Sequence, residues 1–77
     1  GGGGTIKEVK VTNPDVIGKA IKDIKFPEGS LLVLIKRGEE SIIAHGNVVL
    51  EYEDMVTVIG EGDAGEKVER ILYKWKN

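Results

Sequence analysis

The longest uninterrupted apolar segment of the chain runs from Leu31 to Ile35. Its length suits a β-strand, and a strand without polar residues is expected to be buried on both faces at the centre of a sheet. The same segment is far shorter than the roughly 20 apolar residues that span a bilayer. The sequence also lacks the basic stretch followed by an apolar stretch that is typical of a signal peptide. We therefore expect a cytoplasmic domain built on a sheet.

The chain has 77 residues and no cysteine. This length predicts one domain, and a domain so small buries only about 60% of the surface that its unfolded chain exposes. Disulfides and thiolate metal sites are excluded, so packing or oligomerisation must supply the stability. Gly1 to Gly4 have no side chains to bury, and we expect residues 1–4 to be a tag or linker before a domain at 5–77.

The charge balance argues against a polyanion as partner. The chain has 11 basic and 13 acidic residues, a net charge of -2, which gives no broad attraction for nucleic acid. A small nucleic-acid-binding domain of the OB type stays open as the alternative, and would require a basic stripe with exposed aromatic residues. A small subunit of an enzyme stays open only if the active residues lie on another chain.

The first third of the sequence predicts a strand and then a helix. Residues 5–12 alternate in part, but Ile6 is out of phase with Val9 and Val11, which suggests a bulge or a later strand start. Asn13-Pro14-Asp15 is a helix-start signal. The helix after it would place one apolar stripe on the core; its members are Ile17, Ala20, Ile21 and Ile24.

The remainder predicts a hairpin, a last strand and a second helix. Residues 36–40 form the hairpin turn, 41–44 the returning strand, and His45-Gly46-Asn47 the next turn. A short apolar segment at 48–50 precedes the last strand at 55–59. After it, Asp63 and Glu66 fit a capping box, and the helix stripe consists of Val68, Ile71, Leu72 and Trp75. The order β-α-β-β-β-α predicts an α+β fold, a small sheet packed by two helices.

This order and several of its segments resemble the RCK_C domain, also called the TrkA C-terminal domain, which regulates potassium channels and transporters. The resemblance covers nearly the whole chain after the glycines. The segments that carry it are Ile17-Gly18-Lys19, Phe26-Pro27-Glu28-Gly29, residues 33–38, residues 50–54 and residues 56–60. Glu53 stands where family members often have glycine before the Asp of the final turn.

The resemblance implies a cytosolic regulatory domain that controls the gating of potassium transport. It implies a homodimer or larger ring, a potassium-conducting membrane protein as partner at the inner face of the membrane, and a Rossmann-type nucleotide-binding (RCK_N) domain or subunit. We expect this chain to lack that second part, because its 77 residues are predicted to form one domain of the RCK_C type. Some relatives bind cyclic di-AMP through an Arg and an Asn six residues later, but the position six after Arg37 is Ile43.

Lys36 and Arg37 are the best candidates for binding a small anionic effector. An exposed ion pair with Glu39 and Glu40 at the hairpin tip is the alternative explanation. The expected ligand-binding cleft and the expected dimer interface share one residue. The cleft consists of Lys36, Arg37, Ile43 and His45, and the interface of Ile42, Ile43 and Val48.

Other polar and aromatic groups predict no catalytic, metal or cofactor site. Ser41 and His45 lack a third orienting group, and the carboxylates at residues 51–54 lack the spacing of a calcium loop. We expect that group to be a solvated turn in which Asp54 accepts backbone amides. Three aromatic residues could stack nucleic-acid bases, namely Tyr52, Tyr73 and Trp75. Packing in the core or at an interface is the role that we expect for them.

Overall fold

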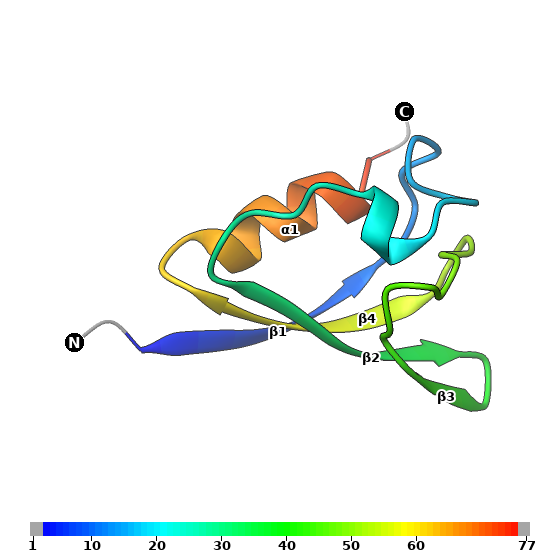
Figure 1. The fold of residues 1–77 in the computed structure, drawn as a ribbon, viewed down its shortest axis with the longest axis horizontal. Coiled ribbons are helices and arrows are strands. Elements are labelled where there is room, and N and C mark those ends of the chain that lie inside the picture. Colours follow the sequence, from blue (N-terminus) through cyan, green and yellow to red (C-terminus); the bar gives the residue numbers. More distant parts are fainter. Residues whose placement is uncertain (1–2, 76–77) are drawn as a thin grey trace.

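The computed structural model describes residues 3–75 and shows a four-stranded antiparallel sheet with one α-helix across one face (Figure 1). The strands lie in the order β1-β4-β2-β3. The elements are β1 (Gly4–Lys10), the 3-10 helix η1 (Ile21–Asp23), β2 (Ser30–Arg37), β3 (Glu40–Ile43), β4 (Met55–Glu61) and α1 (Ala64–Leu72).

The predicted α+β class is confirmed, but the first of the two predicted helices does not form. Residues 14–18 make turns, Gly18 has a φ of 89°, and only three residues coil into η1. The backbone pairs with residues 48–50 instead: Gly18 N donates to Leu50 O, and Leu50 N to Lys19 O. These tertiary hydrogen bonds replace the ones that a helix would have made. Asn13 still caps the turn, because its Oδ1 accepts from Asp15 N.

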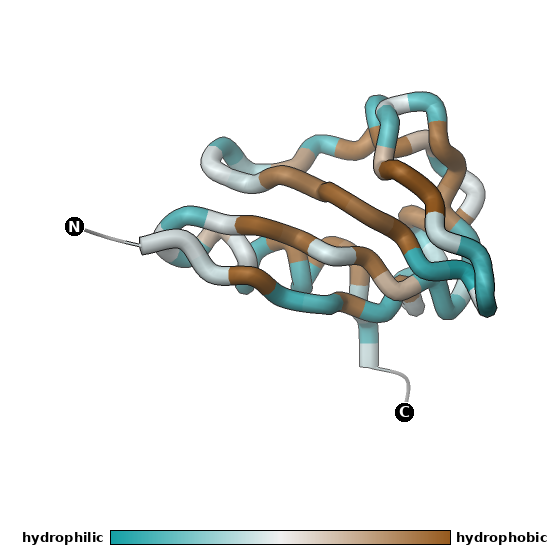
Figure 2. Tube along the Cα trace, turned by 90° about the horizontal axis from the view of Figure 1, so that it is seen from below, coloured by the Kyte–Doolittle hydropathy of each residue, from teal (hydrophilic) through white to brown (hydrophobic). Residues whose placement is uncertain are grey.

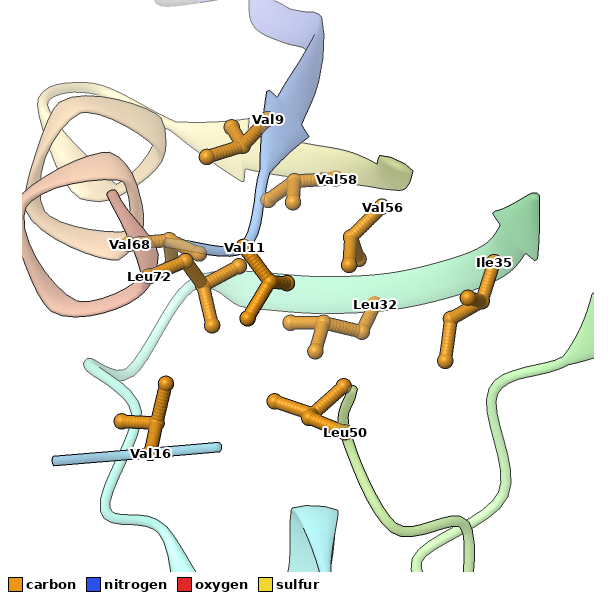
Figure 3. Packing of buried hydrophobic residues seen from close by; sticks show 10 residues of the cluster. All are labelled: Val9, Val11, Val16, Leu32, Ile35, Leu50, Val56, Val58, Val68 and Leu72. Atoms are coloured by element: carbon orange, nitrogen blue, oxygen red, sulfur yellow. The ribbon is translucent and has the colours of Figure 1, made fainter. Parts of the chain in front are cut away.

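The core lies between the sheet and α1, and loop residues close it from the side (Figure 3). Val9, Val56 and Val58 contribute from the strands, because alternate residues of a strand share one face. The helix contributes Val68 and Leu72, two members of the predicted apolar stripe. The other buried apolar side chains of the cluster are Val11, Val16, Leu32, Ile35 and Leu50.

Among residues 3–75, no helix packs on the second face of the sheet, and we call it the open face. β2 lies inside the sheet as predicted, between β4 and β3, but the prediction that it is buried on both faces is wrong: Leu31 is 60% exposed. β1 begins at Gly4 and pairs with β4 in one regular register, so Ile6 needs no bulge and simply lies on the open face. Figure 2 shows the sheet from this side. Gly1 and Gly2, half of the expected tag or linker, lie outside the described residues.

The end of α1 differs from the predicted stripe. The helix ends at Leu72, and Tyr73 follows with extended backbone angles, so Trp75 leaves the helix and is 73% exposed. Asp63 occupies the N-cap position, but its side chain makes no capping hydrogen bond. Within residues 3–75, no helix has the length and apolar character required to cross a membrane.

Candidate functional site

Arg37, the expected anion-binding residue, already binds two carboxylates of its own chain. Its Nε donates to Asp54 Oδ1 at 2.8 Å and its Nη2 to Asp54 Oδ2 at 2.9 Å. Nη1 lies 3.0 Å from Glu51 Oε2, and Nη2 also donates to the carbonyl oxygen of Val49 at 2.9 Å. The alternative explanation, an ion pair of Arg37 with Glu39 or Glu40 at the hairpin tip, is therefore wrong, because the guanidinium is turned toward the loop before β4.

Asp54 is the buried centre of this cluster. It is 1% exposed, and its Oδ2 also accepts a hydrogen bond from Glu51 N at 2.9 Å. Asp54 thus accepts a backbone amide as predicted, and residues 51–53 of its turn are exposed to solvent as expected, although Asp54 itself is buried. The hydrogen bond to Asp54 raises the pKa of Arg37, and the charge of Glu51 acts in the same direction. Arg37 is therefore a fully charged structural tie between β2 and the turn that precedes β4.

Lys36 lies on the opposite face of β2 from Arg37. Successive side chains of a strand alternate between faces, and Ile35, next to Lys36, belongs to the core. The open face therefore receives Lys36, whose register partners are Ser41 on β3 and Met55 on β4. The two expected anion ligands are adjacent in sequence but are not brought together.

The residues expected at the dimer interface are divided in the same way. Ile43 pairs with Leu34 on the open face and is 59% exposed. Ile42 pairs with Ile35 and, like Val48, packs against the core. His45 follows β3 in an exposed turn, where its amide donates to the carbonyl oxygen of Ile43 at 2.8 Å. Only Ile43 of the three predicted interface residues lies on an apolar surface that solvent reaches.

The open face carries exposed apolar side chains that we did not predict as a surface from the sequence. Ile6 and Leu31 are both register partners of Ile59, so the three lie in one row across β1, β4 and β2. Leu34 and Ile43 form a second apolar pair beside Thr57. We call Ile6, Leu31, Ile43 and Ile59 the open-face patch; their exposures are 72%, 60%, 59% and 39%.

Two signals in the sequence pointed toward this patch. The phase mismatch of Ile6 is what a strand with one exposed apolar residue produces, and the unbroken run at 31–35 supplies the second apolar face of β2. The pairing of Arg37 with Asp54 had no such signal, since the two residues lie 17 positions apart. Among the described residues, no three histidine, cysteine or acidic side chains form a group suited to a metal ion.

Comparison with solved structures places the fold. A structure described as an RCK domain with cda superposes with a TM-score of 0.82 at 25% sequence identity, and the match covers 90% of this chain and 99% of that one. The architecture is therefore that of a small RCK-type domain with its sheet open on one side.

Sequence comparison then gives the family. The TrkA-C domain matches residues 6–73, and the chain belongs to this family. A Trk system potassium uptake protein TrkA homolog of Archaeoglobus fulgidus is 39% identical over 70 residues, 91% of this chain. Trk system potassium uptake protein TrkA of Vibrio alginolyticus is 49% identical over 43 residues, 56% of this chain.

These relatives are much longer than this chain. The matched segment makes up 16% of the Archaeoglobus protein and 9% of the Vibrio protein. A homolog of Methanosarcina mazei, 33% identical over 55 residues, is covered over 12% of its length. The similarity therefore covers one domain of each relative and does not extend to the remainder of these proteins.

Proposed function

We propose that this chain is a non-catalytic regulatory domain of a potassium uptake system, acting at the cytoplasmic face of the membrane. The match of the TrkA-C family over residues 6–73, with relatives named as potassium uptake proteins, carries the proposal. Its partners would be a Rossmann-type nucleotide-binding domain and a potassium-conducting membrane protein. The domain would transmit a signal by changing its assembly, which needs no reacting side chain.

The assembly proposed is a homodimer through the open-face patch. Three of its four side chains are more than half exposed, whereas the opposite face of the sheet is covered by α1. A row of exposed apolar side chains across three strands is a larger surface than isolated exposed residues make, and such patches are typical of interaction sites. A twofold interface would place the same patch of each copy against the other. This surface replaces the expected one at Ile42, Ile43 and Val48, of which it keeps Ile43.

A small anionic effector would then bind between the two copies, beside this patch. Lys36 lies on the open face next to Met55 and makes no ion pair with the other described residues. Ile43 offers apolar contact on the same face, and the exposed His45 ends the strand that carries it. Arg37 is held by Asp54 and Glu51, so we assign the anion to Lys36 instead. A solved neighbour of the same fold is described as an RCK domain with cda.

A domain graft tests the regulatory role. Residues 5–75 would replace the matching segment of the Archaeoglobus relative, and potassium uptake would be measured in cells that lack their own uptake system. We expect the unaltered graft to support potassium uptake. We expect the Leu31→Gln graft to change the rate of this uptake, because a polar group interrupts the open-face patch. Val49→Gln is the matched control, an exposed apolar residue away from the sheet. An unaltered graft that supports no uptake would overturn the proposal.

A further inference from the structure

Three of the four aromatic side chains of the protein line one cleft. Tyr52 comes from the turn before β4, and Tyr73 and Trp75 come from the segment after α1. The cleft has a volume of about 340 Å³, and its other lining residues are Lys10, Thr12, Glu53 and Lys74. Tyr52 is 63% and Trp75 73% exposed, so most of their surface lies outside the core. We call this site the aromatic cleft.

Both walls of the aromatic cleft are fixed by the segment that follows β1. Val11 O accepts from Glu53 N at 2.8 Å, which holds the turn that carries Tyr52. On the other side, Thr12 Oγ1 accepts from Lys74 N at 2.8 Å and donates to Lys74 O at 3.1 Å. The two walls therefore keep their spacing without a ligand, which lowers the entropy lost on binding.

The charges of the cleft favour an anion. Lys10 and Lys74 line it against the single carboxylate of Glu53. The ion pairs found among residues 3–75 use neither lysine. Aromatic rings accept a planar ring by stacking, and lysine ammonium groups accept phosphate oxygens. A cationic ligand would also favour aromatic rings but would be repelled by the two lysines.

We propose that the aromatic cleft binds a free mononucleotide. Its base would stack on Tyr52 and Trp75, and its phosphate would be bound by Lys10 and Lys74. A single nucleotide fits better than a nucleic-acid strand, because the net charge of -2 gives the chain no broad attraction for a polyanion. This site goes beyond the proposed regulatory role, and either one can fail without the other.

Trp75 is the only tryptophan, so its fluorescence reports on the cleft directly. Titration with adenosine 5′-monophosphate is expected to quench it with saturation, after correction with free N-acetyltryptophanamide for absorption by the base. Adenosine alone and ribose 5-phosphate alone are each expected to bind at least about tenfold more weakly, because each lacks one of the two contacts. A short oligonucleotide that bound more tightly than the mononucleotide would overturn the proposal.

Substitutions localise the binding. Tyr52→Ala is expected to weaken nucleotide binding by about tenfold. The double variant Lys10→Gln and Lys74→Gln is expected to weaken binding as well. Lys22→Gln, at another exposed lysine, is the control and is expected to leave binding unchanged. Performing the titration on Leu31→Gln, the variant expected to be monomeric, separates this test from the test of dimerisation. Linear quenching equal to that of the free tryptophan amide, or unchanged binding in Tyr52→Ala, would show that the site does not exist.

Discussion

At the scale of single residues, Glu53 is held in a backbone conformation that glycine prefers. Its φ of 72° is the one positive value among the described residues other than glycine. The left-handed region costs a residue with a side chain about 1–2 kcal/mol. The turn still forms, because Glu53 N bonds to Val11 O and Asp54 N to Glu51 O.

Glu53→Gly is therefore expected to stabilise the protein by about 0.5–1 kcal/mol, the relief of strain less the greater entropy of glycine in the unfolded chain. Thermal unfolding followed by circular dichroism measures the change as a rise in Tm. Asn47→Gly, in another exposed turn but without a positive φ, is the control and is expected to give no gain. Equal effects of the two substitutions would show that Glu53 is not strained.

The pairing of Arg37 with Asp54 predicts a large effect from a small change. Asp54→Asn keeps the shape of the side chain but leaves the guanidinium without its buried counter-charge, and we expect a loss of about 2–3 kcal/mol. Asp63→Asn is the matched control, because the pair of Asp63 with Lys67 at 3.7 Å is exposed and contributes close to nothing. Urea unfolding of both variants measures the difference, and equal losses would contradict a structural role for Asp54.

The direction of the pKa shift of Arg37 fixes its charge state. A raised pKa means that folding favours the charged form, so its contribution to stability is complete at neutral pH and is lost only when strongly alkaline pH passes the folded-state pKa. The tie between β2 and the turn at 51–54 is therefore constant across physiological pH and does not act as a pH switch.

At the scale of elements, β4 and α1 approach each other through two glycines. A Cβ built on Gly60 would lie 2.5 Å from the backbone nitrogen of Gly65 and 2.9 Å from its Cα. Neither backbone atom can move without shifting the start of α1. The sharp connection from β4 into the helix therefore requires glycine at residue 60, because any side chain would separate the two elements.

Gly60→Ala is expected to destabilise the protein by about 1–3 kcal/mol, as overpacking of a close contact does. Gly3→Ala is the control, because a Cβ at residue 3 would meet nothing within 4 Å. Thermal unfolding of the two variants should show a lower Tm for Gly60→Ala alone. If Gly60→Ala unfolds at the temperature of the original protein, the contact between β4 and α1 is looser than described.

The elements also show what the sequence could and could not predict. The strands at 31–35 and 55–59 and the helix around Val68 and Leu72 were predictable, because each is marked by a local run or a local spacing of apolar residues. The turns that replace the predicted helix after Asn13 were not predictable. The apolar stripe there is equally compatible with turns whose amides bond to the distant residues 48–50. Arg37 and Asp54 meet only through the sheet topology, which no local pattern contains.

At the scale of the whole molecule, the protein is a two-layer domain that covers only one face of its sheet. Residues 3–75 of this 77-residue chain contain one α-helix, α1, and it covers the core face of the sheet. The other face keeps a row of apolar side chains that a monomer would leave in water. We propose that a second copy of the same face covers this row, which would also add the apolar burial that so small a core lacks.

Sedimentation equilibrium across the micromolar range tests whether the open-face patch forms a dimer. We expect a reversible monomer-dimer equilibrium for the unaltered chain. We expect a monomer at the same concentrations for Leu31→Gln and Ile43→Gln, and a dimer for the control Val49→Gln. A chain that stays monomeric at high micromolar concentration, or that dimerises as well with Leu31→Gln as without it, would contradict a dimer formed through the open-face patch.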